Sequence, residues 1–204
     1  KYRYVIKIPV PTSAVLGFGD IIHKSMQEFY QQVMKGEHPT KETLLSIYEN
    51  KWKSNGFMSK AYEADMKKHG AELLNDYFDK GYDQKTKTIA VEQGFKIKIT
   101  KDVTLGGRID RVDRKPDGTL EIIDYKTGMI KKAGQFSKET DEDHIKRIFE
   151  DSAYKENFQQ LFYASLYMDT EGAEKLVIGI YPLREPSSGI YWFENESISK
   201  EKKA

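Results

Sequence analysis

The chain has 204 residues, enough for one ordinary domain, and its 33 Lys and Arg nearly balance its 32 Asp and Glu. With a net charge of +1 the chain has no global positive field, so any affinity for nucleic acid must come from a local group of basic residues. The absence of cysteine excludes disulfides, zinc fingers and iron–sulfur clusters, and no apolar run approaches the roughly 20 residues that span a bilayer, so we expect a cytoplasmic protein without a membrane segment.

The first part of the chain, residues 1–85, is predicted to be mainly helical. We expect three helices, over about residues 21–34, 41–53 and 59–80, with Asp20 and Thr40 as N-caps of the first two and Gly81 ending the third. In the first helix the apolar residues recur at helical spacing and form one stripe: Ile22, Met26, Phe29, Tyr30 and Val33.

From residue 88 the apolar residues alternate, which predicts a half-buried strand as far as Thr100. Residues 104–114 and 119–128 are then joined by Lys115-Pro-Asp-Gly-Thr119, a sequence with the turn chemistry of a β-hairpin. If Lys115 pairs with Thr119, counting back along both strands places Asp110 opposite Asp124. A slip of one residue in this register stays open.

The segment from Gly128 to about Asp151 is charged and has almost no apolar anchors, so we expect it to be a mobile flap. Residues 153–168 predict an apolar helix, and residues 175–183 and 189–193 predict two closing strands. The order of elements therefore indicates an α/β fold, with a mixed sheet in a core over residues 86–195 and a helical N-terminal part.

Two carboxylates that face each other across a hairpin repel and destabilise it, unless something such as a bound divalent cation compensates. Mg²⁺ prefers oxygen ligands and completes its shell with waters and phosphate. Lys126 falls on the same face as Asp124 and could orient a water or offset charge on a phosphate, so the group suits phosphodiester hydrolysis. The alternative is structural: an Asp-x-Lys pair is often a solvated strand face, and Arg108, Arg111 or Arg114 could simply pair with Asp110.

Four motifs together resemble one family. Gly107-Arg-Ile-Asp110-Arg-Val-Asp, followed by Ile122-Ile-Asp124-Tyr-Lys126-Thr-Gly128, is similar to the RecB-type branch of the PD-(D/E)XK nucleases. Leu16-Gly-Phe-Gly-Asp-Ile-Ile-His23 resembles the Gly…His helix of that branch, and Gln159-Gln-Leu-Phe-Tyr163 resembles its Gln-x-x-x-Tyr helix. The resemblance implies one restriction-endonuclease-like nuclease domain over residues 1–204.

The resemblance also implies roles for the matching positions. Asp110 and Asp124 are expected to bind Mg²⁺ or Mn²⁺ with the backbone carbonyl of Tyr125, and Lys126 is the expected catalytic lysine. His23 is implied as a further ligand, although a single histidine more often has a structural role. Glu92 matches a glutamate often found near such a site.

The expected substrate-binding residues are Gln159, Tyr163 and Arg108. Gln159 and Tyr163 are one helical turn apart and share a face, which ordinary amphipathic packing would also explain. Some relatives carry an iron–sulfur cluster on four cysteines, and a chain without cysteine must belong to a cluster-free type.

The resemblance implies a metal-dependent deoxyribonuclease of DNA recombination and repair, with exonuclease activity expected over endonuclease activity. Relatives carry such a module at the C-terminal end of UvrD/AddA-type helicases, so we expect a fragment of a longer chain with a helicase module as partner. A free-standing nuclease is the alternative for this parentage. The alternatives for activity are a catalytically silent DNA-binding domain on the same fold and a junction resolvase or restriction-type nuclease.

Overall fold

The structure is a computed structural model, and it describes residues 14–54, 56–98, 101, 104–128, 176–184 and 190–193. The chain divides into two compact units, Lys1–Tyr82 and Asp83–Ala204. The boundary lies three residues before the end of the helical part that the sequence predicts. None of the helices that the structure describes has the length and apolarity to span a membrane.

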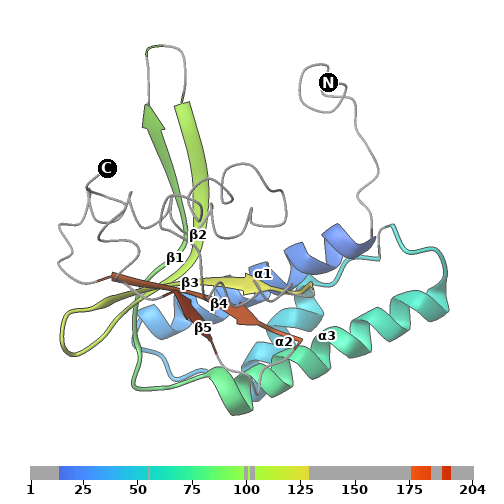
Figure 1. Cartoon of the computed structure of the whole chain (residues 1–204). Helices are drawn as coiled ribbons and strands as arrows, with labels where there is room; N and C mark the ends of the chain where they lie inside the picture. Colours follow the sequence, from blue (N-terminus) through green and yellow to red (C-terminus); the bar gives the residue numbers. More distant parts are fainter. Residues whose placement is uncertain are drawn as a thin grey trace, which may run out of the picture. The chain divides into compact units, whose positions relative to one another are not determined.

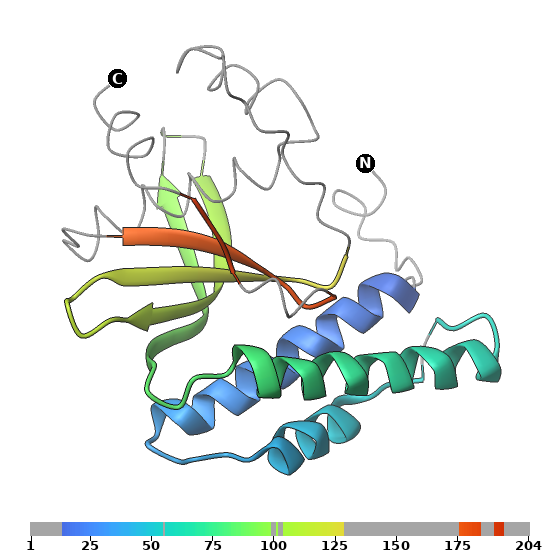
Figure 2. The same cartoon turned by 60° about the horizontal axis from the view of Figure 1, so that its bottom comes forward.

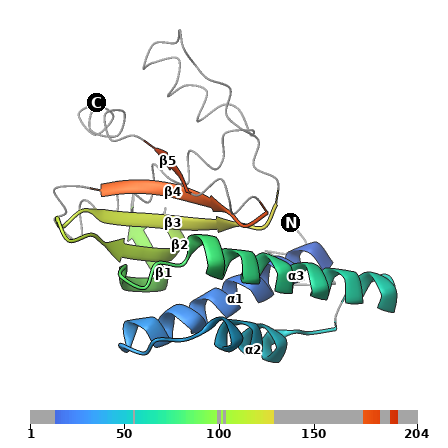
Figure 3. The same cartoon turned by 90° about the horizontal axis from the view of Figure 1, so that it is seen from below.

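The first unit contains three helices, α1 (Ala14–Met34), α2 (Lys41–Lys51) and α3 (Lys60–Gly81), which lie side by side (Figures 2 and 3). Thr40 caps α2 as predicted, because its hydroxyl accepts the Thr43 N–H and the Thr43 side chain accepts the Thr40 N–H in return. Ser59 caps α3 by accepting the Tyr62 N–H at 3.1 Å.

Two of the predicted helix ends are wrong. Helix α1 begins at Ala14, so Asp20 lies inside it, where its carboxylate accepts a bond from Lys24 Nζ one turn later, at 2.6 Å. Helix α2 ends at Lys51, two residues earlier than predicted, and Trp52 is in an extended conformation with its N–H bonded to the Glu49 carbonyl.

The three helices bury the predicted stripe of α1, of which Ile22, Met26, Phe29 and Tyr30 are buried. At one crossing Gly70 of α3 faces Tyr48 of α2 and Phe18 of α1, both fully buried. A side chain at position 70 would overlap the Tyr48 ring, so glycine allows the close approach here. The Tyr48 hydroxyl donates to the Lys67 carbonyl at 3.0 Å.

The second unit is built on a five-stranded sheet in the order β1-β2-β3-β4-β5 (Figure 3). The strands are β1 (Lys87–Lys98), β2 (Thr104–Arg114), β3 (Leu120–Lys126), β4 (Leu176–Pro182) and β5 (Tyr191–Phe193). Strands β3 and β4 are parallel and the other neighbours antiparallel, so the mixed sheet predicted from the sequence is confirmed. The predicted flap at 129–151 and helix at 153–168 lie outside the described residues.

The hairpin between β2 and β3 has the predicted turn. The Lys115 N–H donates to the Thr119 carbonyl at 2.9 Å, and Gly118 has a φ of +86°, which only glycine adopts readily. The ladder pairs Arg114 with Leu120 and continues to Arg111 and Ile123. The predicted register is therefore confirmed over this ladder, which fixes the face of every side chain that follows.

Strands β1 and β2 continue together beyond the point where β2 parts from β3. Their ladder runs out to Lys98 and Thr104, whereas β2 pairs with β3 only between Arg111 and Arg114. Figures 1 and 2 show this outer part projecting as a two-stranded arm away from β3 and β4. We call residues 92–98 and 104–110 the outer ribbon.

Candidate active site

Strand β3 brings Asp124 and Lys126 onto one face of the sheet, as the two-residue period of a strand requires. Their side chains form an ion pair with 2.7 Å between Lys126 Nζ and Asp124 Oδ2. The Asp124 side chain is only 6% exposed, whereas that of Lys126 is 27% exposed. A buried carboxylate is thus fixed in the strand, while the ammonium beside it reaches toward solvent.

Asp110 stands where β2 leaves β3. The ladder ends one residue earlier, at Arg111 and Ile123, so the expected pairing of Asp110 with Asp124 is the next step of this register but is not part of the ladder. Instead the Asp110 carboxylate accepts the backbone N–H of Tyr125 at 2.8 Å. This bond holds Asp110 beside the Asp-Tyr-Lys segment of β3.

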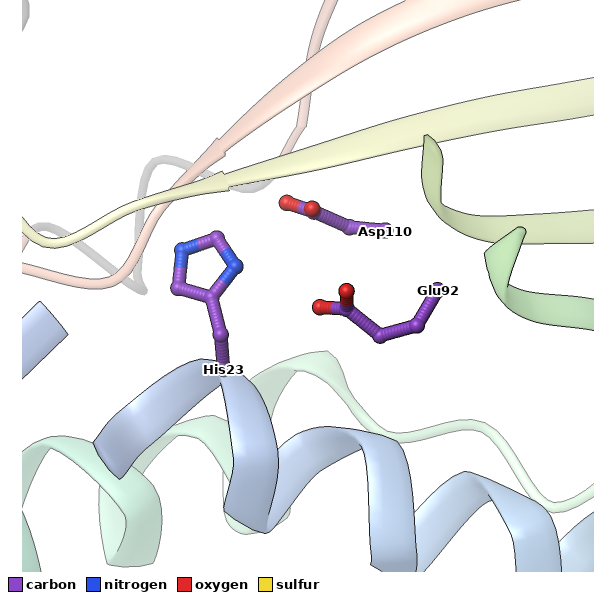
Figure 4. A group of neighbouring side chains, drawn as sticks. All are labelled: His23, Glu92 and Asp110. Carbon is purple, nitrogen blue, oxygen red and sulfur yellow. The ribbon is translucent and has the colours of Figure 1, made fainter. Parts of the chain in front are cut away.

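Glu92 occupies the position of β1 that faces Asp110 across the ribbon, between the pairs Val91–Arg111 and Gln93–Ile109. Its φ is +49°, a left-handed conformation that costs a non-glycine residue about 1–3 kcal/mol. The carboxylates of Glu92 and Asp110 end next to each other, with oxygens within 4.8 Å (Figure 4). Arg108 Nη1 lies 3.2 Å from Glu92 Oε2. Strain is therefore found where two carboxylates are brought together.

The reverse face of the same strands holds a buried polar network that the sequence reasoning missed. Arg111 lies 2.9 Å from the Asp113 carboxylate and also donates to the Tyr125 hydroxyl at 2.5 Å. Thr88 donates to Asp113 at 2.8 Å. Arg111 therefore pairs with Asp113, and the alternative in which it neutralises Asp110 is wrong, because alternate residues of a strand point to opposite faces. That alternation was the signal in the sequence.

A second ion pair lies on this reverse face, next to the hairpin turn. Lys115 Nζ is 2.5 Å from Glu121 Oε1, and this hydrogen bond raises the pKa of the lysine ammonium. Glu121 pairs with Asp113 across the ladder, so the two carboxylates are neutralised by separate cations, Lys115 and Arg111. Like-charged neighbours would otherwise destabilise the sheet.

The oxygens available in the sheet unit fit a hard divalent cation. Asp110, Asp124 and Glu92 supply carboxylates, the ligand type that Mg²⁺ and Mn²⁺ prefer. His23, also labelled in Figure 4, lies on α1 in the helical unit. Gln159 and Tyr163 lie outside the described residues. A site of this composition, with a lysine beside the carboxylates, can bind a phosphodiester and support its hydrolysis.

Comparisons with known proteins give one result for this chain. A search of curated proteins returned no match. The profile of the PD-(D/E)XK nuclease superfamily matches residues 1–204. The mixed sheet and the Asp110, Asp124 and Lys126 arrangement agree with that match. The chain belongs to the PD-(D/E)XK nuclease superfamily, and its fold is the α/β fold of that family, with an added helical part at the N-terminal side.

Proposed function

We propose that this protein is a metal-dependent deoxyribonuclease that hydrolyses phosphodiester bonds during DNA recombination or repair. Its membership of the PD-(D/E)XK superfamily supports a nuclease that uses a divalent metal. We further propose an exonuclease that works with a helicase module, on the basis of the RecB-like motifs around His23 and Asp124.

The proposed ligands of the cation are Asp110, Asp124 and the backbone carbonyl of Tyr125, with Glu92 and His23 as further members. The bond from the Tyr125 N–H to Asp110 supports this set, because it ties the two strands that carry the carboxylates. The proximity of Glu92 to Asp110 supports it as well. Mg²⁺ or Mn²⁺ in such a set polarises the phosphate and acidifies a water.

Lys126 is the proposed catalytic lysine. Its ammonium is held by Asp124 and can donate to a non-bridging phosphate oxygen or orient the attacking water, while negative charge grows on the phosphate. Arg108, 68% exposed, is proposed to contact the substrate, as are Gln159 and Tyr163. In this arrangement the carboxylates fix the position of the reacting phosphate, and Lys126 acts on the charge that develops during the reaction.

One observation carries the proposal. Asp124 is buried at the end of an apolar strand, where an ionised carboxylate is costly to keep, and a lysine two residues on is held at 2.7 Å from it. A solvated strand face, the structural alternative, would leave both side chains exposed to water. The pairing instead retains a carboxylate and an ammonium together at one position of the sheet.

The test compares Lys126→Ala with Lys87→Ala, an exposed lysine at the start of β1. Single-turnover cleavage of labelled DNA with Mg²⁺ or Mn²⁺ should fall by about 10²–10³ in Lys126→Ala, as for loss of one preorganised electrostatic group. DNA binding should change by only a few-fold, and Lys87→Ala should cleave as the wild type does. Unchanged cleavage in Lys126→Ala would remove that lysine from the mechanism.

A second measurement addresses the mode of cleavage. Linear DNA labelled at one end should be shortened from its ends, and a covalently closed circle should stay intact. Nicking of the circle would identify an endonuclease. If the wild type cuts neither substrate with either metal, the protein is a catalytically silent DNA-binding domain, and the proposed activity is wrong.

A further inference from the structure

The outer ribbon begins at the carboxylates and carries no third strand among the residues that the structure describes. Glu92 and Asp110 form its inner end, and Lys98 and Thr104 its outer end. Two isolated strands are marginally stable in water, so such an arm gains stability when a ligand covers one of its faces. The face of interest is the one that bears Asp110.

This face of the ribbon is strongly basic. In an antiparallel pair, opposite residues share a face and the faces alternate along each strand. The face with Glu92 and Asp110 therefore also carries Arg108, Lys96 and Lys98, and the contact of Arg108 with Glu92 shows that these two are on one side. Every lysine and arginine of the outer ribbon lies on this face. The charge is sorted to one side.

The cross-strand neighbours of these cations are small and uncharged. Gly94 is opposite Arg108, Gly106 is opposite Lys96, and Thr104 is opposite Lys98. A Cβ built at Gly94 would meet nothing closer than a backbone oxygen 4.0 Å away. No carboxylate across the ladder neutralises the row, and the small neighbours leave space for a ligand to approach the backbone.

The length of the row sets the size of a ligand. From Asp110 to Thr104 is six residues, or about 20 Å at about 3.4 Å per residue of an extended strand. Successive phosphates along one strand of B-form DNA advance by about 3.4 Å along the axis, so about 20 Å corresponds to about six nucleotides. Cations at two-residue intervals match a polyanion that runs along the ribbon.

We propose that the basic face of the outer ribbon, formed by Arg108, Lys96 and Lys98, is the path along which the phosphates of a DNA strand approach the carboxylates. The inference rests on the proposed nuclease function and deepens it. The strand lies along the ribbon for about six nucleotides from the scissile phosphate, as the extended-strand spacing gives. The contacts are to the sugar-phosphate backbone, so they position DNA of any sequence.

The test compares two double variants of equal charge. Lys96→Ala with Lys98→Ala removes the outer half of the row, and Lys85→Ala with Lys87→Ala removes two exposed lysines at the other end of β1. Affinity for a short DNA oligonucleotide is measured by fluorescence anisotropy with Ca²⁺ in place of Mg²⁺, at several salt concentrations. Melting curves establish that both variants are folded.

The ribbon variant should bind DNA more weakly than the wild type at 50 mM salt. Because each lost phosphate contact lowers the slope of log affinity against log salt by about 0.9, two contacts should narrow the difference from the wild type about tenfold between 50 and 200 mM salt. The control variant should bind as the wild type does. Equal losses in both variants would indicate a general charge effect and would overturn the proposed path.

Neutral methylphosphonates placed one at a time locate the contacts along the strand. Replacement of phosphates about four to six nucleotides from the cleavage site should weaken binding by the wild type, as the length of the row predicts, and should have little effect on the ribbon variant. If the wild type cleaves DNA but both proteins respond alike, the path is wrong and the nuclease function stands. If the ribbon variant alone loses binding but no protein cleaves, the path stands and the function fails.

Discussion

Replacement of Gly70 by alanine tests how tightly the three helices pack. Alanine is favoured over glycine inside a helix by about 0.8–1 kcal/mol, so a helix with free space around this position would be stabilised. The structure predicts the opposite. The new Cβ would lie 2.2 Å from Tyr48 Oη, 2.7 Å from Tyr48 Cζ and 2.9 Å from Phe18 Cε2, all closer than real Cβ contacts.

The magnitude follows from two opposing terms. Overpacking a close-packed core by one methyl group typically costs about 1–3 kcal/mol. Three overlaps with two fully buried rings place Gly70→Ala in the upper part of that range, and the helix preference of alanine offsets about 1 kcal/mol of it. The free energy of unfolding should therefore fall by about 1–2 kcal/mol, with a Tm lower by about 2–4 °C for each kcal/mol.

Urea unfolding followed by circular dichroism measures the effect, with Gly17→Ala as the matched control. Gly17 is in α1, and a Cβ added there would meet nothing within 4 Å, so this variant should be neutral or slightly more stable. Tyr48→Phe removes the atom with the shortest overlap, and the double variant should be less destabilised than the sum of the single ones by at least about 0.5 kcal/mol. A stabilised Gly70→Ala, or strict additivity, would refute the packing argument.

Two further predictions concern protonation and metal binding. Burial, with a smaller effect of Glu49, raises the pKa of the Tyr48 hydroxyl above its usual 10.0, so its contribution to stability is present below about pH 10 and is lost at higher pH. Unfolding curves between pH 9 and 12 should show a steeper alkaline loss of stability in the wild type than in Tyr48→Phe, and parallel curves would contradict this. Asp110→Asn should weaken Mn²⁺ binding in calorimetry by about tenfold or more, the scale seen when even outer-shell partners are lost, whereas exposed Asp65→Asn should not; equal affinities would place the cation elsewhere.

The hairpin was the most predictable part of the molecule. Pro-Asp-Gly fixed a three-residue turn, and a turn fixes the register of both strands, so the pairing from Arg114 back to Arg111 followed by counting. The ion pair of Asp124 with Lys126 followed from the same period of two. Local backbone chemistry decided these features, and local chemistry is written in the sequence.

Features that depend on distant partners were not predictable. Asp20 has the composition of an N-cap, but the helix continues past it to Ala14, and the carboxylate pairs with Lys24 instead. The left-handed φ of Glu92 has no sequence signal, because the residue is not glycine, asparagine or aspartate. The end of the β2–β3 ladder at Arg111, which frees Asp110 to accept the Tyr125 N–H, depends on how far β2 bends from β3.

The buried network behind the catalytic strand constrains how this sequence can diverge. The planar guanidinium of Arg111 serves the Asp113 carboxylate and the Tyr125 hydroxyl at once, a geometry that lysine cannot reproduce. Loss of one partner would strand a buried charge at a cost of about 3–5 kcal/mol, whereas replacing the whole group by apolar residues of similar volume can be neutral. Descendants of this chain should therefore keep Arg111 and Asp113 together or lose both, so the two positions should covary while the surfaces around them drift independently.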